Sequence, residues 1–285
     1  MRTSPLSRAL ALVLLTATSL ARAADWVPAH LSDGQPDVRG FYKPKVEGTF
    51  SLVRPARAPG INELEKIDQT VKAGRALPPS AASRVIDPAD GQVPYQPWAR
   101  EKQQRIQANM EYWTRPEHID PQARCVPGGV TRAIFWAQLE IRQYPGYVVF
   151  VFDMNHPYRV IPLDNRPHVS PEIKLWMADS RGHWEGNTLV IDVTNSNSKH
   201  RLSNEGDFAS DQVHITERYT FIDADHFKLE QRYEDPTVYT RPWTLASDFY
   251  RAHQDEPDYE WWESECHEGE QDVEHLYHGD KSRPY

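Results

Sequence analysis

The sequence predicts a mainly β protein: an antiparallel, calycin- or lipocalin-like barrel with an extended N-terminal arm and one or two helices. From Arg132 onward, apolar and polar residues alternate in one short segment after another, as is typical of half-buried strands. Gly, Asp and Asn separate these segments, and we see no helical pattern between them, which favours an antiparallel meander. Closing such a sheet into a barrel removes its exposed edges. A β-sandwich is the alternative.

Seven segments carry the predicted strands, and Pro145-Gly146 provides a tight turn between the first two. They are RAIFWAQLEIR (132–142), YVVFVFD (147–153), PYRVIPL (157–163), NTLVIDVTN (187–195), QVHITERYTF (212–221), DHFKLEQRYE (225–234) and TVYTRPWTLASDF (237–249).

The chain divides into three parts. Residues 1–23 have the basic start, short apolar run and Ala-Arg-Ala ending of a secretory signal peptide. Residues 24–97 are rich in Pro and Gly, and we expect an extended arm over the surface, with one short helix from Asn62 to about Ala73. Residues 98–285 contain a helix up to Pro116, the barrel and an acidic C-terminal segment. In that helix Trp98, Ile106, Met110 and Trp113 are spaced for packing on the core.

The charge of the chain excludes some partners. Removing residues 1–23 removes three arginines and no acid, so the formal charge falls from −9 to about −12. Nucleic-acid binding depends on clustered Lys and Arg, so we expect no nucleic-acid partner. No later segment approaches the length of a membrane span, so we expect a periplasmic or secreted protein without membrane insertion after cleavage.

Cys125 and Cys266 are the only two cysteines. In an oxidising compartment such a pair is most simply a disulfide. On the chain-entropy model, closing so long a loop contributes about 5 kcal/mol. A catalytic thiol or a metal ligand is the alternative. We expect residues 258–268 to form a docked strand pinned by this bond, with His267 facing a pocket.

Strand alternation places two polar residues on apolar faces. In 212–221, Glu217 shares a face with Val213, Ile215, Tyr219 and Phe221, whereas His214 points the other way. In the next strand, Gln231 falls between Leu229 and Tyr233 on the inward face. A buried carboxylate must be paired, protonated or used in catalysis. Glu217 is therefore either a general acid or base, or half of an ion pair with an arginine across the barrel.

The segment from Asp179 to Gly186 combines turn residues with Arg181, His183, Trp184 and Glu185. We expect a tight turn there, and polar groups beside an aromatic wall also suit a small-molecule site. Candidate catalytic residues are thus Glu217, His156, His214, Arg181 and His267. Candidate substrate-binding residues are Asp179, Trp184, Gln231, Tyr233, Arg241 and Trp243.

Motifs for metals and organic cofactors are not found. His156 and His168 lie near several acids, but no HExxH, Cys-x-x-Cys or EF-hand spacing occurs. Nor does the sequence contain a G-x-S-x-G elbow, a phosphate-binding loop or a dinucleotide fingerprint. We therefore expect neither a metal nor a cofactor.

Several blocks between Pro94 and Gly269 resemble a family of uncharacterised secreted bacterial proteins. They are PYQPWA, DPQARCVPGGV, NHPYRVIPLDNRPH, WMADSRGHWEGNTLV, HITERY, DPTVYTRPWT and ECHEG. The resemblance implies that these blocks mark one site, and it supplies no catalytic residues. Glu270-Gln271-Asp272 departs from the Asn and aromatic residue of the relatives.

Two functions follow from these observations. One is a cofactor-independent lyase, isomerase or hydrolase that uses acid–base chemistry on a small carbohydrate or aromatic compound. The other is a non-catalytic, lipocalin-like carrier of a small molecule.

Overall fold

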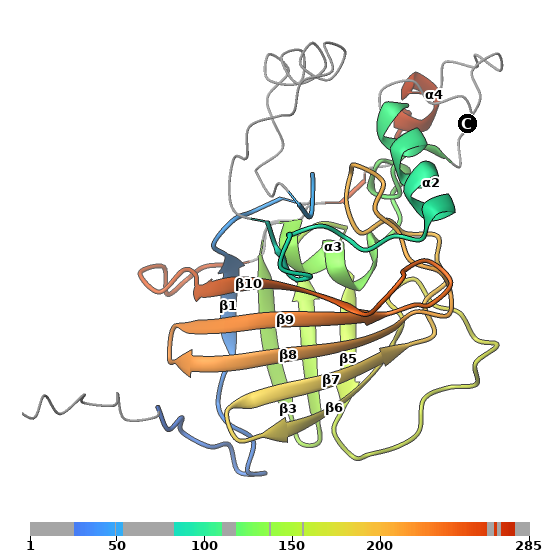
Figure 1. Ribbon diagram of the computed structural model, residues 1–285. Coiled ribbons are helices and arrows are strands. Elements are labelled where there is room, and N and C mark those ends of the chain that lie inside the picture. Colours follow the sequence, from blue (N-terminus) through green and yellow to red (C-terminus); the bar gives the residue numbers. More distant parts are fainter. Residues whose placement is uncertain are drawn as a thin grey trace, which may run out of the picture.

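The computed structural model describes residues 26–48, 50–53, 83–109, 118–136, 138–155, 157–260, 265–266 and 269–276. Their strands form a nearly closed antiparallel barrel, which confirms the predicted fold class (Figure 1). Strands β6 to β10 run across the front of Figure 1, and β3 and β5 cross behind them. Among the described residues, no helix is long and apolar enough to span a membrane.

The strand order around the barrel is β5-β4-β3-β1-β10-β9-β8-β7-β6, and the short β2 pairs with β10 outside this path. Sequential strands are neighbours within β3–β5 and within β6–β10, so the predicted meander is confirmed. The strands are β1 (Gly40–Pro44), β2 (Val85–Asp87), β3 (Leu139–Tyr144), β4 (Tyr147–Phe152), β5 (Tyr158–Pro162), β6 (Asp179–Glu185), β7 (Thr188–Thr194), β8 (His214–Asp223), β9 (His226–Glu234) and β10 (Trp243–Arg251).

The N-terminal arm contributes to the barrel rather than lying only over its surface. Its β1 lies between β3 and β10, where Tyr42 pairs with both Leu139 and Arg251. Tyr42 is fully buried among the interior aromatic rings, which explains why this short strand is held in the sheet. The helix expected at 62–73 and the leader at 1–23 lie outside the described residues.

Alternation along the strands fills the barrel interior as predicted. In β8 and β9 every second residue is buried, beginning with Ile215 and Phe227. Aromatic rings dominate this interior, and Phe227 stacks on Phe249 with 4.7 Å between ring centroids.

The junction between β5 and β6 is closed by side chains. These two strands contact each other without being hydrogen-bonded neighbours in the sheet order. A Cβ on Gly182 of β6 would lie 2.7 Å from Cγ2 of Ile161 on β5, so the glycine allows the close approach. Across the same junction, Arg159 of β5 donates a hydrogen bond of 2.8 Å to Oγ of Ser180 on β6. We call this junction the β5–β6 seam.

In the described part of the chain, three helices and one short 3-10 helix accompany the barrel. They are α2 (Pro97–Ala108), η2 (Gln122–Arg124), α3 (Gly129–Trp136) and α4 (Asp272–Leu276). Helix α2 ends before Met110 and Trp113, which lie outside the described residues. It buries Ala99, Gln103 and Ile106, so the expected core position of Ile106 is confirmed, whereas that of Trp98 was wrong because its side chain is 48 % exposed.

The first predicted strand was wrong in part, because residues 129–136 form α3. Residues Gly129 to Phe135 are all buried, at one end of the barrel. A segment that is buried on every side, polar residues included, has no periodicity to separate a buried helix from a buried strand. Only its continuation, β3, is a strand.

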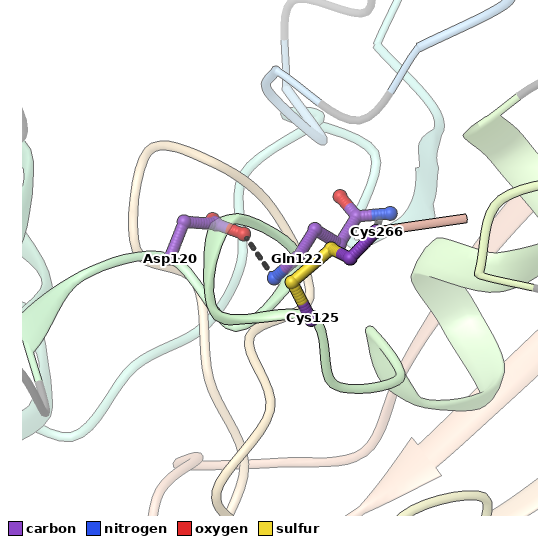
Figure 2. The surroundings of a disulfide bond; sticks show 4 residues. All are labelled: Asp120, Gln122, Cys125 and Cys266. Atoms are coloured by element: carbon purple, nitrogen blue, oxygen red, sulfur yellow. Dashed lines mark hydrogen bonds between the residues drawn. A yellow bond between two sulfur atoms is a disulfide. The ribbon is translucent and has the colours of Figure 1, made fainter. Parts of the chain in front are cut away.

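The disulfide between Cys125 and Cys266 is confirmed (Figure 2), with a sequence separation of 141 residues and 5.9 Å between the Cα atoms. Cys125 follows η2, and the backbone N–H of Gln122 donates to Oδ1 of Asp120 at 3.0 Å. The described residues of 258–268 include no strand, contrary to expectation. The bond therefore fastens Cys266, which lies in neither a helix nor a strand, to this turn.

Candidate functional site

Five polar side chains form a continuous chain of hydrogen bonds on the outer face of β6, β7 and β8. We call this set, Arg181, Asp179, His168, Asp192 and His214, the outer-face network. Arg181 lies opposite Asp192 in the sheet register. Three of its members, Asp179, Arg181 and His214, are candidates that the sequence had named without placing them together.

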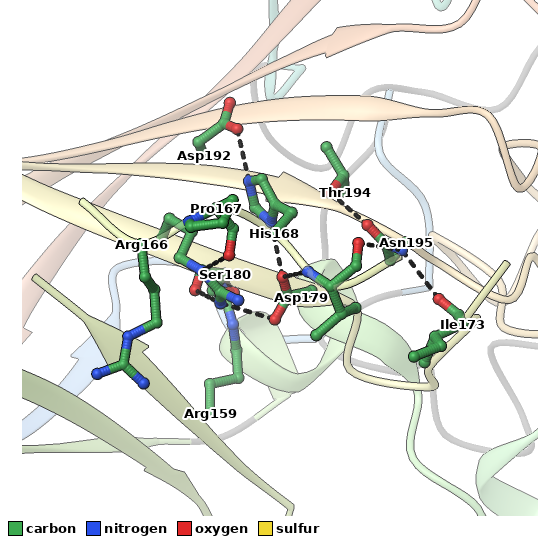
Figure 3. A network of polar contacts seen from close by, with 12 residues as sticks. Arg159, Arg166, Pro167, His168, Ile173, Asp179, Ser180, Asp192, Thr194 and Asn195 are labelled. Atoms are coloured by element: carbon green, nitrogen blue, oxygen red, sulfur yellow. Dashed lines mark hydrogen bonds and ion pairs between the residues drawn. The ribbon is translucent and has the colours of Figure 1, made fainter. Parts of the chain in front are cut away.

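His168 is the centre of the outer-face network (Figure 3). Its Nδ1 lies 2.7 Å from Oδ2 of Asp179, and its Nε2 lies 2.7 Å from Oδ2 of Asp192. The imidazole of His168 therefore bridges the carboxylates of Asp179 and Asp192.

Arg181 secures the other side of Asp179. Its Nη1 donates to Oδ1 of Asp179 at 2.7 Å, and its Nε donates to the carbonyl of Pro167 at 3.0 Å. The backbone N–H of Val169 donates to Oδ2 of Asp179 at 3.1 Å. These bonds fix the segment that carries His168 against β6.

Asn195 holds the segment that follows His168 in the chain. It lies just after β7 with a φ of 63°, which places its side chain under the loop. Its Nδ2 donates to the carbonyls of Ser170 at 2.8 Å and Ile173 at 2.9 Å (Figure 3). Asn tolerates this left-handed conformation better than most residues. The position of His168 thus depends on contacts remote from its own sequence.

Asp192 is shared by two histidines. His168 bonds Oδ2, and Nε2 of His214 bonds Oδ1. Partial burial acts to raise the pKa of Asp192, but the hydrogen bonds from His214 and His168 outweigh it and lower the pKa below the ordinary value. Asp192 therefore stays ionised and can orient both rings.

His214 is the accessible end of the outer-face network. Its side chain is 40 % exposed, and Asp192 engages its Nε2. The remaining ring nitrogen, Nδ1, is then the atom that can exchange a proton with a bound molecule. A carboxylate that orients one nitrogen while the other meets substrate is the arrangement of a general base.

A second set of polar residues lies inside the barrel. We call Arg159, Glu217, Gln231, Tyr233 and Thr131 the interior network. Nη2 of Arg159 lies 2.8 Å from Oε2 of Glu217, and Nε2 of Gln231 donates to Oε1 of Glu217 at 2.6 Å. Tyr233 continues the interior network by donating to Oε1 of Gln231 at 3.2 Å, and its hydroxyl lies 2.6 Å from that of Thr131 on α3.

The interior network is sealed from solvent. Glu217 and Gln231 are both 0 % exposed, and Arg159 is 3 % exposed. Burial acts to lower the pKa of Arg159, but the charge of Glu217 and its hydrogen bond raise the pKa above the ordinary value. Burial also raises the pKa of Tyr219 and Tyr233, so both phenols remain neutral. Glu217 therefore forms an ion pair with Arg159 across the barrel, which is one of the two roles predicted from the sequence.

The other predicted residues fall in separate places. Trp243 is fully buried inside the barrel and stacks on Tyr233 at 4.3 Å between centroids. Trp184 is half-buried and packs near Phe221 with 6.2 Å between centroids. Arg241 is exposed, lies just before β10 and binds Asp87 at 2.7 Å rather than a member of either network. His156 and His267 lie outside the described residues.

The expected turn at Asp179 was wrong, because Asp179–Glu185 is strand β6 and the turn comes after it. Alternation along β6 turns Asp179 and Arg181 outward and Ser180 and Gly182 inward. Gly182, one of the glycines that suggested a turn, instead allows the close approach of the two strands at the β5–β6 seam.

A third buried polar contact lies beside α3. Oγ of Ser196 is 2.8 Å from Nε2 of His200, and both residues are buried. The missing side chain of Gly129 leaves room for this imidazole, since a Cβ there would lie 2.5 Å from Cγ of His200. Burial, followed by the charge of Arg132, lowers the pKa of His200 to about 4. His200 is therefore neutral at physiological pH.

Sequence reasoning missed Asp192, Arg159 and the role of His168. Asp192 interrupts the apolar run LVIDV, and its outward position on a strand was available as a signal. Arg159 and His168 gave no such signal, because their partners come from other strands. In the described part of the chain, no group of three or more His, Cys, Asp and Glu side chains is arranged to hold a metal ion.

The comparisons with known proteins add no relative to this picture. No model of a protein family matches the chain, and a search of curated proteins also finds no match.

Proposed function

We propose that this protein is a periplasmic or secreted enzyme that acts on a small molecule by acid–base chemistry without an organic cofactor. The single observation that carries the proposal is the bond between Asp192 and Nε2 of His214, with the histidine 40 % exposed. The disulfide between Cys125 and Cys266 supports a location outside the cytoplasm.

In the proposed reaction, His214 removes a proton through Nδ1 from the substrate or from a water molecule. Asp192 accepts the hydrogen bond from Nε2–H and stabilises the imidazolium that forms. The proton then returns from His214 to the product or the leaving group. This sequence serves a lyase, an isomerase or a hydrolase equally well.

A variant comparison tests this role. Purified wild type, His214→Gln and His183→Gln are assayed for hydrolysis, β-elimination and epimerisation on saccharides, sugar esters and phenolic esters. His183 is the matched control, because it also lies on the outer face and binds a carboxylate, Glu185, at 3.2 Å. We expect turnover that falls about 10²–10⁴-fold in His214→Gln and persists in His183→Gln. Turnover that is equal in all three proteins, or none on the whole panel, would refute the proposal.

A lipocalin-like carrier is the second candidate, and one observation favours it. Nε and Nη1 of Arg159 are buried inside the barrel and have no hydrogen-bond partner among the described residues. Buried donors of this kind suit a ligand that supplies oxygen acceptors.

A thermal-shift screen separates the two candidates. A carrier gains stability from its ligand, and Arg159→Met reduces this gain while His214→Gln does not. If His214→Gln alone lost the ligand-induced shift of the thermal midpoint, the ligand would bind at the outer-face network, and the enzyme would be favoured over the carrier.

A further inference from the structure

The outer face around His214 has a composition that restricts what can bind there. Its positions are the residues of β6, β7, β8 and β9 that alternate with the inward ones, although Thr188 and Val190 on β7 are themselves buried. They are Asp179, Arg181, His183, Glu185, Thr188, Val190, Asp192, Thr194, His214, Thr216, Arg218, Thr220, Ile222, His226, Lys228, Glu230, Arg232 and Glu234. None is Phe, Tyr or Trp.

Each Lys and Arg at these positions already has a carboxylate partner. Nη1 of Arg181 is 2.7 Å from Asp179, and Nη2 of Arg218 is 2.8 Å from Glu185. On β9 the pairing is local: Nζ of Lys228 is 2.7 Å from Oε1 of Glu230.

Arg232 and Glu234 on β9 form the pair next to His214. Glu234 lies opposite His214 in the register, and Arg232 lies opposite Thr216. The two side chains bind each other as an ion pair. On the other side of Thr216, both carboxylate oxygens of Asp192 are already bound, one by His168 and one by His214.

Each Lys, Arg, Asp and Glu at these positions therefore already has a partner, so none of these groups is left free to bind an acidic or a basic substrate. An anion could bind only by displacing an existing carboxylate. The hydroxyls at the outward positions of β7 and β8 can both donate and accept hydrogen bonds. Thr216 places one such hydroxyl between Asp192 and Arg232.

We infer that the site around His214 takes an uncharged, hydroxyl-rich substrate, a neutral saccharide or polyol derivative, rather than an acidic, basic or aromatic compound. This inference rests on the proposed function, since it names the substrate class of the same site. Glu234 acts in it as a specificity-determining residue, because its carboxylate neutralises Arg232 beside His214.

The test measures binding, so that it does not depend on turnover. The probes are methyl β-D-glucoside, its uronic acid counterpart, glucosamine and phenol, titrated into 15N-labelled His214→Gln and followed by NMR at the amides of Thr216 and residue 214. The background lacks the proposed base, so nothing is consumed. We expect the uncharged glucoside to shift these amides at concentrations at least about tenfold lower than the other three.

Removing the charge of Glu234 then tests whether the paired charges cause the preference for the uncharged probe. With His214→Gln retained, Glu234→Gln leaves Arg232 without its partner, and the uronic acid should bind several-fold more tightly, with an advantage that added salt removes. Adding Arg232→Gln should restore the preference for the glucoside. The folded state of each variant is checked by its 15N spectrum.

The possible outcomes separate this inference from the proposed function. Tighter binding of the uronic acid, the amine or phenol before the charge change would overturn the inference, and so would no binding of any probe. The role of His214 would still stand or fall by the turnover assay on wild type, His214→Gln and His183→Gln.

Discussion

The two networks share strand β8 and differ in which face they occupy. Glu217 points into the barrel, is 0 % exposed and binds Arg159. His214, three residues earlier, points outward, is 40 % exposed and binds Asp192. Inside, the charges are desolvated and must remain paired for the barrel to be stable. Outside, water reaches the histidine and a proton can be exchanged. The difference separates a group that stabilises the fold from one that can react.

The largest effect is expected from breaking the interior pair. Glu217→Gln keeps the shape of the side chain but leaves Arg159 as an unpaired buried charge, so the free energy of unfolding should fall by about 3–5 kcal/mol. Urea denaturation measures this change. Glu230→Gln is the control, because Glu230 pairs with Lys228 on the outer face of the neighbouring strand and should cost at most about 1 kcal/mol. Equal losses in both variants would remove the distinction between the two faces.

A buried histidine should behave differently from the exposed His214 when the pH falls. The pKa of His200 is lowered to about 4 in the folded state. Below about pH 6.5 the imidazole of residue 200 binds a proton in the unfolded chain, whereas in the folded chain it does so only at about pH 4. The contribution of neutral His200 to the free energy of unfolding is therefore fully present above pH 6.5. It falls by about 3 kcal/mol as the pH falls towards 4. Urea denaturation between pH 7 and pH 4 measures the slope of the free energy of unfolding against pH. It should flatten in His200→Gln and stay steep in His183→Gln.

The β5–β6 seam offers a smaller and more local test. A methyl group at position 182 would lie 2.7 Å from Cγ2 of Ile161 and 3.1 Å from Cδ2 of Leu163. Gly182→Ala should therefore lower the free energy of unfolding by about 1–3 kcal/mol. Gly186→Ala is a useful comparison, since nothing lies within 4 Å of a Cβ there and only its φ of 58° opposes the change. Amide exchange in β5 should accelerate in Gly182→Ala and not in Gly186→Ala.

The smallest change in stability is expected at His214 itself. Because the residue is exposed, His214→Gln should alter the free energy of unfolding by no more than about 0.5 kcal/mol. Thermal and urea denaturation of the same preparations used for turnover measure this value. A loss of several kcal/mol would mean that the outer-face network holds the sheet together, and the kinetic effect could not then be assigned to chemistry.

Local patterns predicted much of the fold and part of the site. Alternation was sufficient to place Glu217 and Gln231 inside and His214 outside, because a strand turns successive side chains to opposite faces. It failed for 129–136, where burial on all sides removes the pattern, and for Asp179, where turn residues lie within a strand. It also could not join Arg159 to Glu217, since that contact crosses the barrel between β5 and β8. The position of His168 depends on Asn195 and Asp179, and no local rule relates these residues.

The place of β1 has a consequence for how the chain matures. Tyr42 pairs with Arg251, so the first strand to leave the ribosome is completed by the last. Until β10 has emerged, one edge of β1 and one edge of β9 lack their partner, and unpaired edges favour association between chains. Such non-local pairing also slows folding. These edges therefore stay exposed until β10 has been synthesised and the barrel can close.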